Sequence, residues 1–212
     1  TGWAGPISVL PTYQGKGVGK ELVKHSLEYL DVRGCSDIGL ETMPESLVNV
    51  GMYLRIGLTP AGLVLIMGRG LAEADPPEES TTDEVMVERF SESRAKDDIL
   101  SRIRKLSDAL QPGLDYSPEV VTTQDYLSGE TLIATSGNRL VGFSIVHTHP
   151  RREGMQNAVV KALVISPSAG DLPLEPLLAA SELLALDDRS AEISIPVPSV
   201  CSRAVDVLFS RG

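Results

Sequence analysis

Cysteine and aromatic residues are scarce in this sequence of 212 residues. It has two cysteines, Cys35 and Cys201, and only 4% of its residues are Phe, Trp or Tyr. Two cysteines are too few for a disulfide framework or a cysteine-rich metal site. A core with so few rings must be built mainly from aliphatic side chains, and at 42% hydrophobic residues the chain can still bury a sizeable one.

Long apolar runs and long basic runs are also missing. No stretch approaches the roughly 18 consecutive apolar residues of a membrane helix, and the sequence shows no signal-peptide pattern. The formal net charge is −10, which opposes binding to the phosphate backbone of a nucleic acid. We therefore expect no nucleic-acid partner, no membrane and a cytoplasmic location.

The charge is unevenly distributed along the chain. Residues 1–71 hold six basic and six acidic residues, whereas residues 72–84 hold six acidic residues and no basic one. This Pro- and acid-rich segment buries too little apolar surface to order itself, so we predict a linker, with a charged surface loop as the alternative. The expected domains are therefore 1–71 and 85–212, joined by an acidic linker at 72–84.

Apolar periodicity predicts alternating strands and helices in both parts. In the first part we expect strands at 6–10, 37–42 and 62–70 and helices at 18–34 and 46–57. In the second part we expect strands at 85–90, 157–166 and 191–197, a hairpin at 130–149 that turns at 136–138, and helices at 94–110, 172–186 and 200–211. This order is typical of an α/β fold.

The two parts also align with each other at a separation of about 155 residues. With Pro11 placed on Pro167, the helix positions Leu22, Val23, Leu27 and Leu30 fall on Leu178, Ala179, Leu183 and Leu186. We interpret this alignment as a tandem repeat of one domain.

Three glycines and two lysines lie between the first predicted strand and the first predicted helix. The stretch is Gln14-Gly15-Lys16-Gly17-Val18-Gly19-Lys20. Unpaired N–H groups at a helix start attract anions, and glycines let the backbone approach them. The stretch therefore predicts a pyrophosphate-binding loop, although a glycine-rich turn of purely structural role is the alternative.

Two familiar phosphate motifs do not fit this loop. Compared with a Walker A loop, this stretch lacks the leading glycine and has Glu21 where a hydroxyl residue should stand. Compared with the dinucleotide fingerprint G-x-G-x-x-G, it has Lys20 in place of the third glycine.

The loop instead resembles the Q/R-x-x-G-x-G/A signature of the GCN5-related N-acetyltransferase (GNAT) superfamily. Downstream, "MYLRIGL" at 52–58 resembles the end of that family's "LYxxxGF" helix, with Tyr53 four residues before Gly57. The resemblance covers residues 6 to about 70. It implies a mixed, mostly antiparallel sheet flanked by helices, and it implies acetyl-CoA as the cofactor.

The resemblance also implies roles for individual residues. The strand backbone at Ile7, Ser8 and Val9 would pair with the pantetheine arm. Tyr53 would donate a proton to the departing thiolate, a task that a phenol can perform. The amides of the loop would hold the pyrophosphate, and its residues are Gln14, Gly15, Lys16, Gly17, Val18, Gly19 and Lys20.

The sequence departs from the family pattern in two places. At the position of a family asparagine, seven residues before the tyrosine, the sequence has Ser46, and Asn49 lies only four residues before Tyr53. Both are candidates for contact with the cofactor. The strands and helices that normally precede the signature are not present before Thr1, so we expect an N-terminally incomplete first copy. The general base is not assigned, and Glu41 at the end of a strand is a candidate.

The second copy is expected to be degenerate. In the repeat alignment, the three glycines become Asp171, Pro173 and Glu175, which repel a phosphate or remove an N–H donor. Tyr53 falls on Leu208 or Phe209, neither of which has a hydroxyl group.

The histidines offer weaker candidates. His147 and His149 would share a strand face and could bind a metal, but no third ligand is evident, so we predict no metal. His25 is expected on a solvated helix face, and "HPRR" at 149–152 is a small basic spot that suits a 3′-phosphate, an acidic partner or simply a solvated turn.

The sequence thus predicts an N-acetyltransferase that moves an acetyl group from acetyl-CoA to a small-molecule or peptide amine by direct transfer. The alternatives are a non-catalytic acyl-CoA-binding or regulatory module and an inert fragment. We expect the second domain to pack on the first, and an oligomer is compatible with the sequence.

Overall fold

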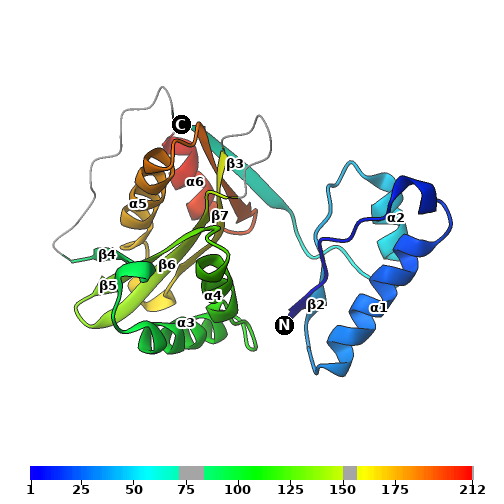
Figure 1. Ribbon diagram of the computed structural model, residues 1–212, viewed down its shortest axis with the longest axis horizontal. Helices are drawn as coiled ribbons and strands as arrows, with labels where there is room; N and C mark the ends of the chain where they lie inside the picture. Colours follow the sequence, from blue (N-terminus) through cyan, green and yellow to red (C-terminus); the bar gives the residue numbers. More distant parts are fainter. Residues whose placement is uncertain (72–83, 150–156, 212) are drawn as a thin grey trace. The chain divides into compact units, whose positions relative to one another are not determined.

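A computed structural model of the chain describes residues 1–71, 84–149 and 157–211 (Figure 1). These residues form two compact units, Thr1–Ala61 and Gly62–Gly212. The fold is α/β, with helices around a mixed and mostly antiparallel sheet. None of the helices in the described ranges combines the length and the apolar character that a bilayer span requires.

The first unit contains two helices and a pair of very short strands. Its helices are α1 (Val18–Val32) and α2 (Leu47–Arg55), and a 3-10 turn, η1 (Pro11–Tyr13), precedes α1. Strands β1 (Gly2–Trp3) and β2 (Ile38–Gly39) pair in parallel. Only Gly2, Ala4 and Val23 are buried in this unit, so it has little core of its own.

The strand expected at 6–10 is wrong. Residues 4–10 form no regular structure, and the parallel ladder ends where the Ala4 N–H donates to the Gly39 carbonyl at 2.9 Å. Pro6 has no N–H group with which to extend the ladder. The second predicted strand, 37–42, is likewise reduced to the two residues of β2.

The second unit is built on a six-stranded sheet in the order β3-β8-β7-β6-β5-β4. The strands are β3 (Val64–Gly70), β4 (Met86–Arg89), β5 (Gly129–Ser136), β6 (Arg139–His147), β7 (Asn157–Ile165) and β8 (Glu192–Pro198). Among the described residues of this sheet, only β7 and β8 pair in parallel. The predicted hairpin is confirmed, since β5 and β6 are joined through Gly137 and Asn138 and Gly137 has a φ of +58°.

Helices cover both faces of this sheet. Along β5, side chains alternate between the two faces, so Leu132 and Ala134 belong to one apolar cluster and Ile133 to the other. On the Ile133 face lie α3 (Lys96–Leu110) and α4 (Ser117–Asp125), with the 3-10 turn η2 (Phe90–Glu92). On the opposite face lie α5 (Leu174–Asp187), which follows the 3-10 turn η3 (Pro167–Ala169), and α6 (Ser202–Ser210).

Helix α4 was not predicted from the sequence. Its run of β-branched residues, Val120 to Thr123, has a low intrinsic helix propensity. Asp115 starts the helix instead, because its carboxylate accepts hydrogen bonds from the backbone N–H of Ser117 at 2.8 Å and from the Ser117 hydroxyl at 2.7 Å. Burial of Val120 against the sheet then stabilises it.

Strand β3 differs from its expected place. The sequence assigns residues 62–70 to the first domain, but β3 pairs antiparallel with β8, from Val64 opposite Pro198 to Gly70 opposite Glu192. The boundary between the compact units therefore lies between Ala61 and Gly62 rather than after residue 71. A local apolar pattern predicts a strand but not its partner, which explains the difference. All of the predicted linker except Glu84 lies outside the described residues.

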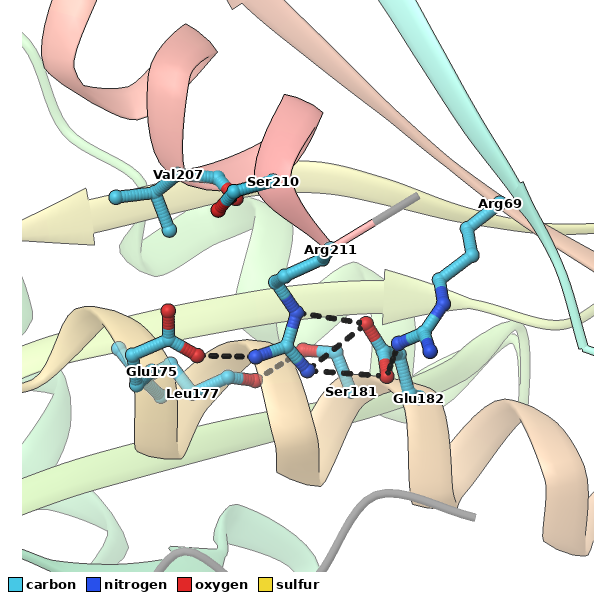
Figure 2. Close-up of polar contacts among 8 residues, drawn as sticks. All are labelled: Arg69, Glu175, Leu177, Ser181, Glu182, Val207, Ser210 and Arg211. Carbon is cyan, nitrogen blue, oxygen red and sulfur yellow. Dashed lines mark hydrogen bonds and ion pairs between the residues drawn. The ribbon is translucent and has the colours of Figure 1, made fainter. Parts of the chain in front are cut away.

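A buried ion-pair network fastens β3 and α6 to α5. Glu182 on α5 has a side chain that is 5% exposed and accepts a hydrogen bond from Arg69 of β3 at 2.6 Å. Arg211, at the end of α6, donates to the same carboxylate at 3.1 Å and also reaches Glu175 (Figure 2). One carboxylate thus ties together three elements that are distant in the sequence.

Candidate functional site

The glycine-rich loop forms an open turn at the start of α1. Gly15 and Gly17 have φ angles of +73° and +83°, in the left-handed region that favours glycine, and Gly17 is the N-cap of the helix. Apart from the adjacent residues of the chain, no atom of the described residues lies within 4 Å of a Cβ built at either position. Glycine is therefore required here by backbone conformation, and the space above it is open.

The amides of this loop are free to bind a ligand. The first N–H group bonded into α1 is that of Glu21, which donates to the Gly17 carbonyl at 3.1 Å. Within the described part of the chain, the N–H groups from Gly15 to Lys20 have no hydrogen-bond partner. Several such groups on consecutive residues form an anion-binding surface.

Positive charge surrounds these amides. The Lys16 ammonium lies 5.5 Å from the centre of the Tyr13 ring, and Lys20 and Lys16 form no ion pair with any described residue. Lys24, one turn further, pairs with Glu21 at 3.2 Å. Together with the partial positive charge of the helix start, the two unpaired lysines favour a polyanion such as a diphosphate.

Gln14 and Val9 connect this loop to the segment before it. The Gln14 side-chain amide donates to the Val9 carbonyl at 2.9 Å, and a Cβ at Gly19 would lie 3.6 Å from a Val9 methyl group. The structure thus brings Val9 beside the loop, although Ile7, Ser8 and Val9 do not form the predicted strand.

The candidates on α2 lie apart from these contacts. Tyr53 is half-buried, and its hydroxyl has no hydrogen-bond partner among the described residues. Ser46 is the N-cap of α2 but makes no side-chain cap bond, and Asn49 is exposed. No hydrogen bond or ion pair between described residues joins α2 to the loop.

The start of α5, which the repeat alignment of the sequence places on this loop, is closed by ion pairs. Asp171 pairs with Arg203, and Glu175 in the first turn of α5 pairs with Arg211 (Figure 2). Both arginines come from α6 and its end. This helix start therefore carries acidic groups with cations already bound to them, which is the reverse of the charge at α1.

The remaining sequence candidates do not assemble into a site. His147 Nε2 contacts the Thr123 hydroxyl at 2.9 Å on α4, whereas His149 lies past the end of β6 with Nδ1 3.7 Å from Asp188. The shared face predicted for the two histidines is therefore wrong. Within the described ranges no three His, Cys, Asp or Glu residues are placed to hold a metal ion.

Two further candidates are solvent-facing. His25 lies 3.2 Å from Glu28 on an exposed part of α1, and Glu41 is exposed. The "HPRR" stretch lies outside the described residues after His149.

Comparison with known proteins supports the resemblance read from the loop. The sequence model of the acetyltransferase (GNAT) family matches residues 1–58, and no curated protein sequence matches the chain. Among solved structures, a GCN5-related glucosamine N-acetyltransferase region of a fungal multi-domain GH3 β-N-acetylglucosaminidase matches with a TM-score of 0.62 and 16% identity, over 92% of this chain and 27% of that one.

The chain has the fold of the GCN5-related N-acetyltransferases. A second GNAT structure, from Sphaerobacter thermophilus, has a TM-score of 0.57 and 14% identity over 89% of this chain and 61% of that one. A tandem GNAT protein from the clavulanic acid biosynthesis pathway has a TM-score of 0.61 and 13% identity, over 96% and 69% of the two chains. The chain thus spans 27% and 61% of the length of the first two GNAT structures.

Proposed function

We propose that this chain is part of an N-acetyltransferase that binds acetyl-CoA through the loop at Gly15–Lys20 and transfers the acetyl group directly to an amine. The observation that carries the proposal is the row of unpaired amides on that loop, with Lys16 and Lys20 beside them. Bound acetyl-CoA supplies the acetyl group in activated form, as a thioester. The GNAT family match over residues 1–58 includes this loop.

The residues present fit such a ligand. The amides of the loop would hold the pyrophosphate, Gln14 would keep the preceding segment against the loop through the Val9 carbonyl, and the backbone at residues 7–9 would face the pantetheine arm. A backbone N–H of that segment would stabilise the charge that develops on the thioester oxygen. Tyr53 would donate its hydroxyl proton to the departing sulfur, and Ser46 and Asn49 would lie on the cofactor side of α2.

The second unit is proposed to be a degenerate copy of the first. Each unit has a 3-10 turn that begins at a proline, Pro11 or Pro167, before its long helix. The parallel pair Gly2 and Ile38 in the first unit corresponds to Ala158 and Ile193 in the second. Both helices end alike, since the Cys35 N–H bonds the Leu30 carbonyl at 3.1 Å and the Ser190 N–H bonds the Ala185 carbonyl at 2.9 Å.

This correspondence supports two copies of one domain whose helix starts carry opposite charge. The first copy presents lysines and free amides at its helix start, whereas the second presents Asp171 and Glu175 already paired with arginines. We expect one acetyl-CoA per chain. Glu175→Ala should leave that stoichiometry unchanged in a calorimetric titration, and a second binding event in the unmodified chain would contradict the degenerate second copy.

Calorimetry with Gly17→Glu tests the proposal directly. This substitution puts a Cβ on a residue with a φ of +83° and a carboxylate beside the phosphates, so the affinity for acetyl-CoA should fall by roughly 100-fold or more. Gly34→Glu is the matched control, because Gly34 has a φ of +77° at the opposite end of the same helix. Equal affinity in wild type and Gly17→Glu would overturn the placement of the cofactor.

A non-catalytic acyl-CoA sensor is the second candidate, because Tyr53 makes no hydrogen bond to the loop among the described residues. A panel of small amines and peptide amines separates the two functions. Release of coenzyme A with any of them supports transfer, while tight binding without release supports a sensor.

A further inference from the structure

A cavity in the second unit combines an apolar floor with an unneutralised carboxylate. It has a volume of about 220 Å³ and lies between the first turns of α3 and the strands β4, β5 and β6. This is below the roughly 300–1,000 Å³ of sites for drug-sized ligands, so it suits a small molecule. It lies in the second unit, whereas the loop proposed for acetyl-CoA lies in the first.

The floor of the cavity is rigid and apolar. Ile133 on β5 is 1% exposed and Ile99 on α3 is 7% exposed, and Leu140 on β6 packs against the same cluster. Ile133 and Ile99 are held by the core from below, so they offer a fixed surface to a short alkyl chain.

Glu88 supplies the charge at the rim. It lies opposite Ile133 in the β4–β5 ladder, so its side chain projects from the same face of the sheet as that isoleucine. Its carboxylate forms no hydrogen bond or ion pair with any described residue. The cavity therefore has a negative charge that the protein leaves unpaired.

Among the described residues that line the cavity, the one cation already has its own partners. Arg102 donates to the Asp98 carboxylate at 2.7 Å and to the Asn138 backbone carbonyl at 2.8 Å. These two bonds turn the guanidinium toward α3 and the hairpin, and they neutralise Asp98. The hydroxyl of Thr135 and the side-chain amide of Asn138 retain unused hydrogen-bonding capacity within the part of the chain that the structure describes.

We propose that this cavity binds a small primary amine in its ammonium form. Glu88 pairs with the ammonium group, and Thr135 and Asn138 accept its remaining N–H bonds. The alkyl part lies on Ile99, Ile133 and Leu140. This inference concerns the second unit alone and does not depend on acetyl transfer by the first.

A titration of the whole chain with n-butylammonium, followed by amide NMR, tests the inference. The resonances of Gly137 and Asn138 at the rim should shift and saturate with a Kd of order 1 mM, as expected for one charge-assisted contact on a small apolar floor. Glu88→Gln should raise that Kd about fivefold or more, because a charged hydrogen bond is replaced by a neutral one. Glu92→Gln, which changes an exposed carboxylate of η2 outside the cavity lining, should leave it unchanged.

Two isosteric ligands complete the experiment. Butyrate and n-butanol should shift the same resonances far more weakly. Three results would each overturn the proposal: equal shifts with n-butanol, an unchanged Kd in Glu88→Gln, or tighter binding of butyrate. In each case the ligand would be bound by the apolar floor or by Arg102 rather than by Glu88.

Discussion

Tyr53 is the residue on which the proposed chemistry depends most directly. The residue is half-buried and its hydroxyl has no hydrogen-bond partner among the described residues, so the hydroxyl is available to donate a proton. Tyr53→Phe removes only that hydroxyl. With the best amine of a panel, kcat should fall by about 100-fold or more, while the Kd for acetyl-CoA in calorimetry should change little.

Tyr29→Phe provides the matching control, because Tyr29 is 59% exposed on α1. That variant should keep the kcat of the unmodified chain. An undiminished kcat in Tyr53→Phe would remove the tyrosine from the reaction.

His147 makes stability depend on pH near neutrality. Burial lowers the pKa of His147 below its ordinary value of 6.5, Glu119 acts in the opposite direction, and Lys161 lowers it further. The unfolded chain then binds the proton more readily than the folded one, so stability is complete above about pH 7 and falls as the pH drops through 6.5. His147→Gln should flatten the curve of urea midpoint against pH between about 7.5 and 5.5.

Asp115 acts at a lower pH. Burial alone would raise the pKa of Asp115, but hydrogen bonds from Ser117 and the nearby Arg104 outweigh it and lower the pKa below 3.8. Its stabilising effect is therefore lost only in more acidic solution, below the range assigned to His147. If His147→Gln retained the full slope above pH 5.5, another group would be responsible for it.

The loop residues could be predicted from the sequence, whereas Glu88 and Glu182 could not. Glycines at alternate positions before a helix already indicate left-handed backbone, and Gly15 and Gly17 adopt it. The importance of Glu182 arises from Arg69, 113 residues earlier in the chain. Such a pairing leaves no periodic signal in the sequence.

The ion-pair network is the feature of greatest consequence at the level of the elements. Glu182→Gln keeps the shape of the side chain but leaves the guanidiniums of Arg69 and Arg211 without their buried carboxylate. The free energy of unfolding should fall by about 3 kcal/mol, as for other broken buried pairs. Urea denaturation measures this loss, and the amides of β3 should exchange their hydrogens faster.

Glu175→Gln is the natural comparison for that variant. Glu175 also pairs with Arg211, but its side chain is 51% exposed, so its removal should cost less than about 1 kcal/mol. Equal losses in the two variants would show that burial of Glu182 is not the source of the effect.

Most elements were predictable because strongly periodic segments fold as their pattern indicates. Helices α1, α2, α3, α5 and α6 and the β5–β6 hairpin lie within the predicted ranges or close to them. The misses have local causes. Helix α4 depends on the hydrogen bonds of Asp115 to Ser117 and on burial of Val120, and the strand expected at 6–10 includes Pro6, which cannot donate to a ladder.

The assignment of β3 to the second sheet changes how the molecule should be divided. A fragment of residues 62–212 retains all six strands, whereas a fragment of residues 85–212 loses β3, which leaves the edge of β8 unpaired and the Glu182 carboxylate without Arg69. The longer fragment should unfold cooperatively at a clearly higher urea midpoint, and the shorter one should aggregate or unfold earlier. Identical midpoints would mean that β3 adds nothing to the second unit.

At this scale the sequence predicts the family of folds but not the boundary. The GNAT resemblance rests on two short motifs within the first 58 residues, and the family match covers the same range. The sheet order that joins residues 64–70 to residues 192–198 is set by long-range pairing. It becomes visible only in three dimensions.

Strand β3 also limits where recombination can separate the coding regions of the two units. The seven residues of β3, which follow the first unit in the chain, pair with the backbone of β8, and one of them, Arg69, also bonds Glu182. A recombination that replaced everything before the acidic segment with the same part of a homologue would also replace β3. The six-stranded sheet of the second unit would then have an edge strand that did not evolve with β8. Lineages that shuffle these parts should therefore keep their crossover points before Gly62.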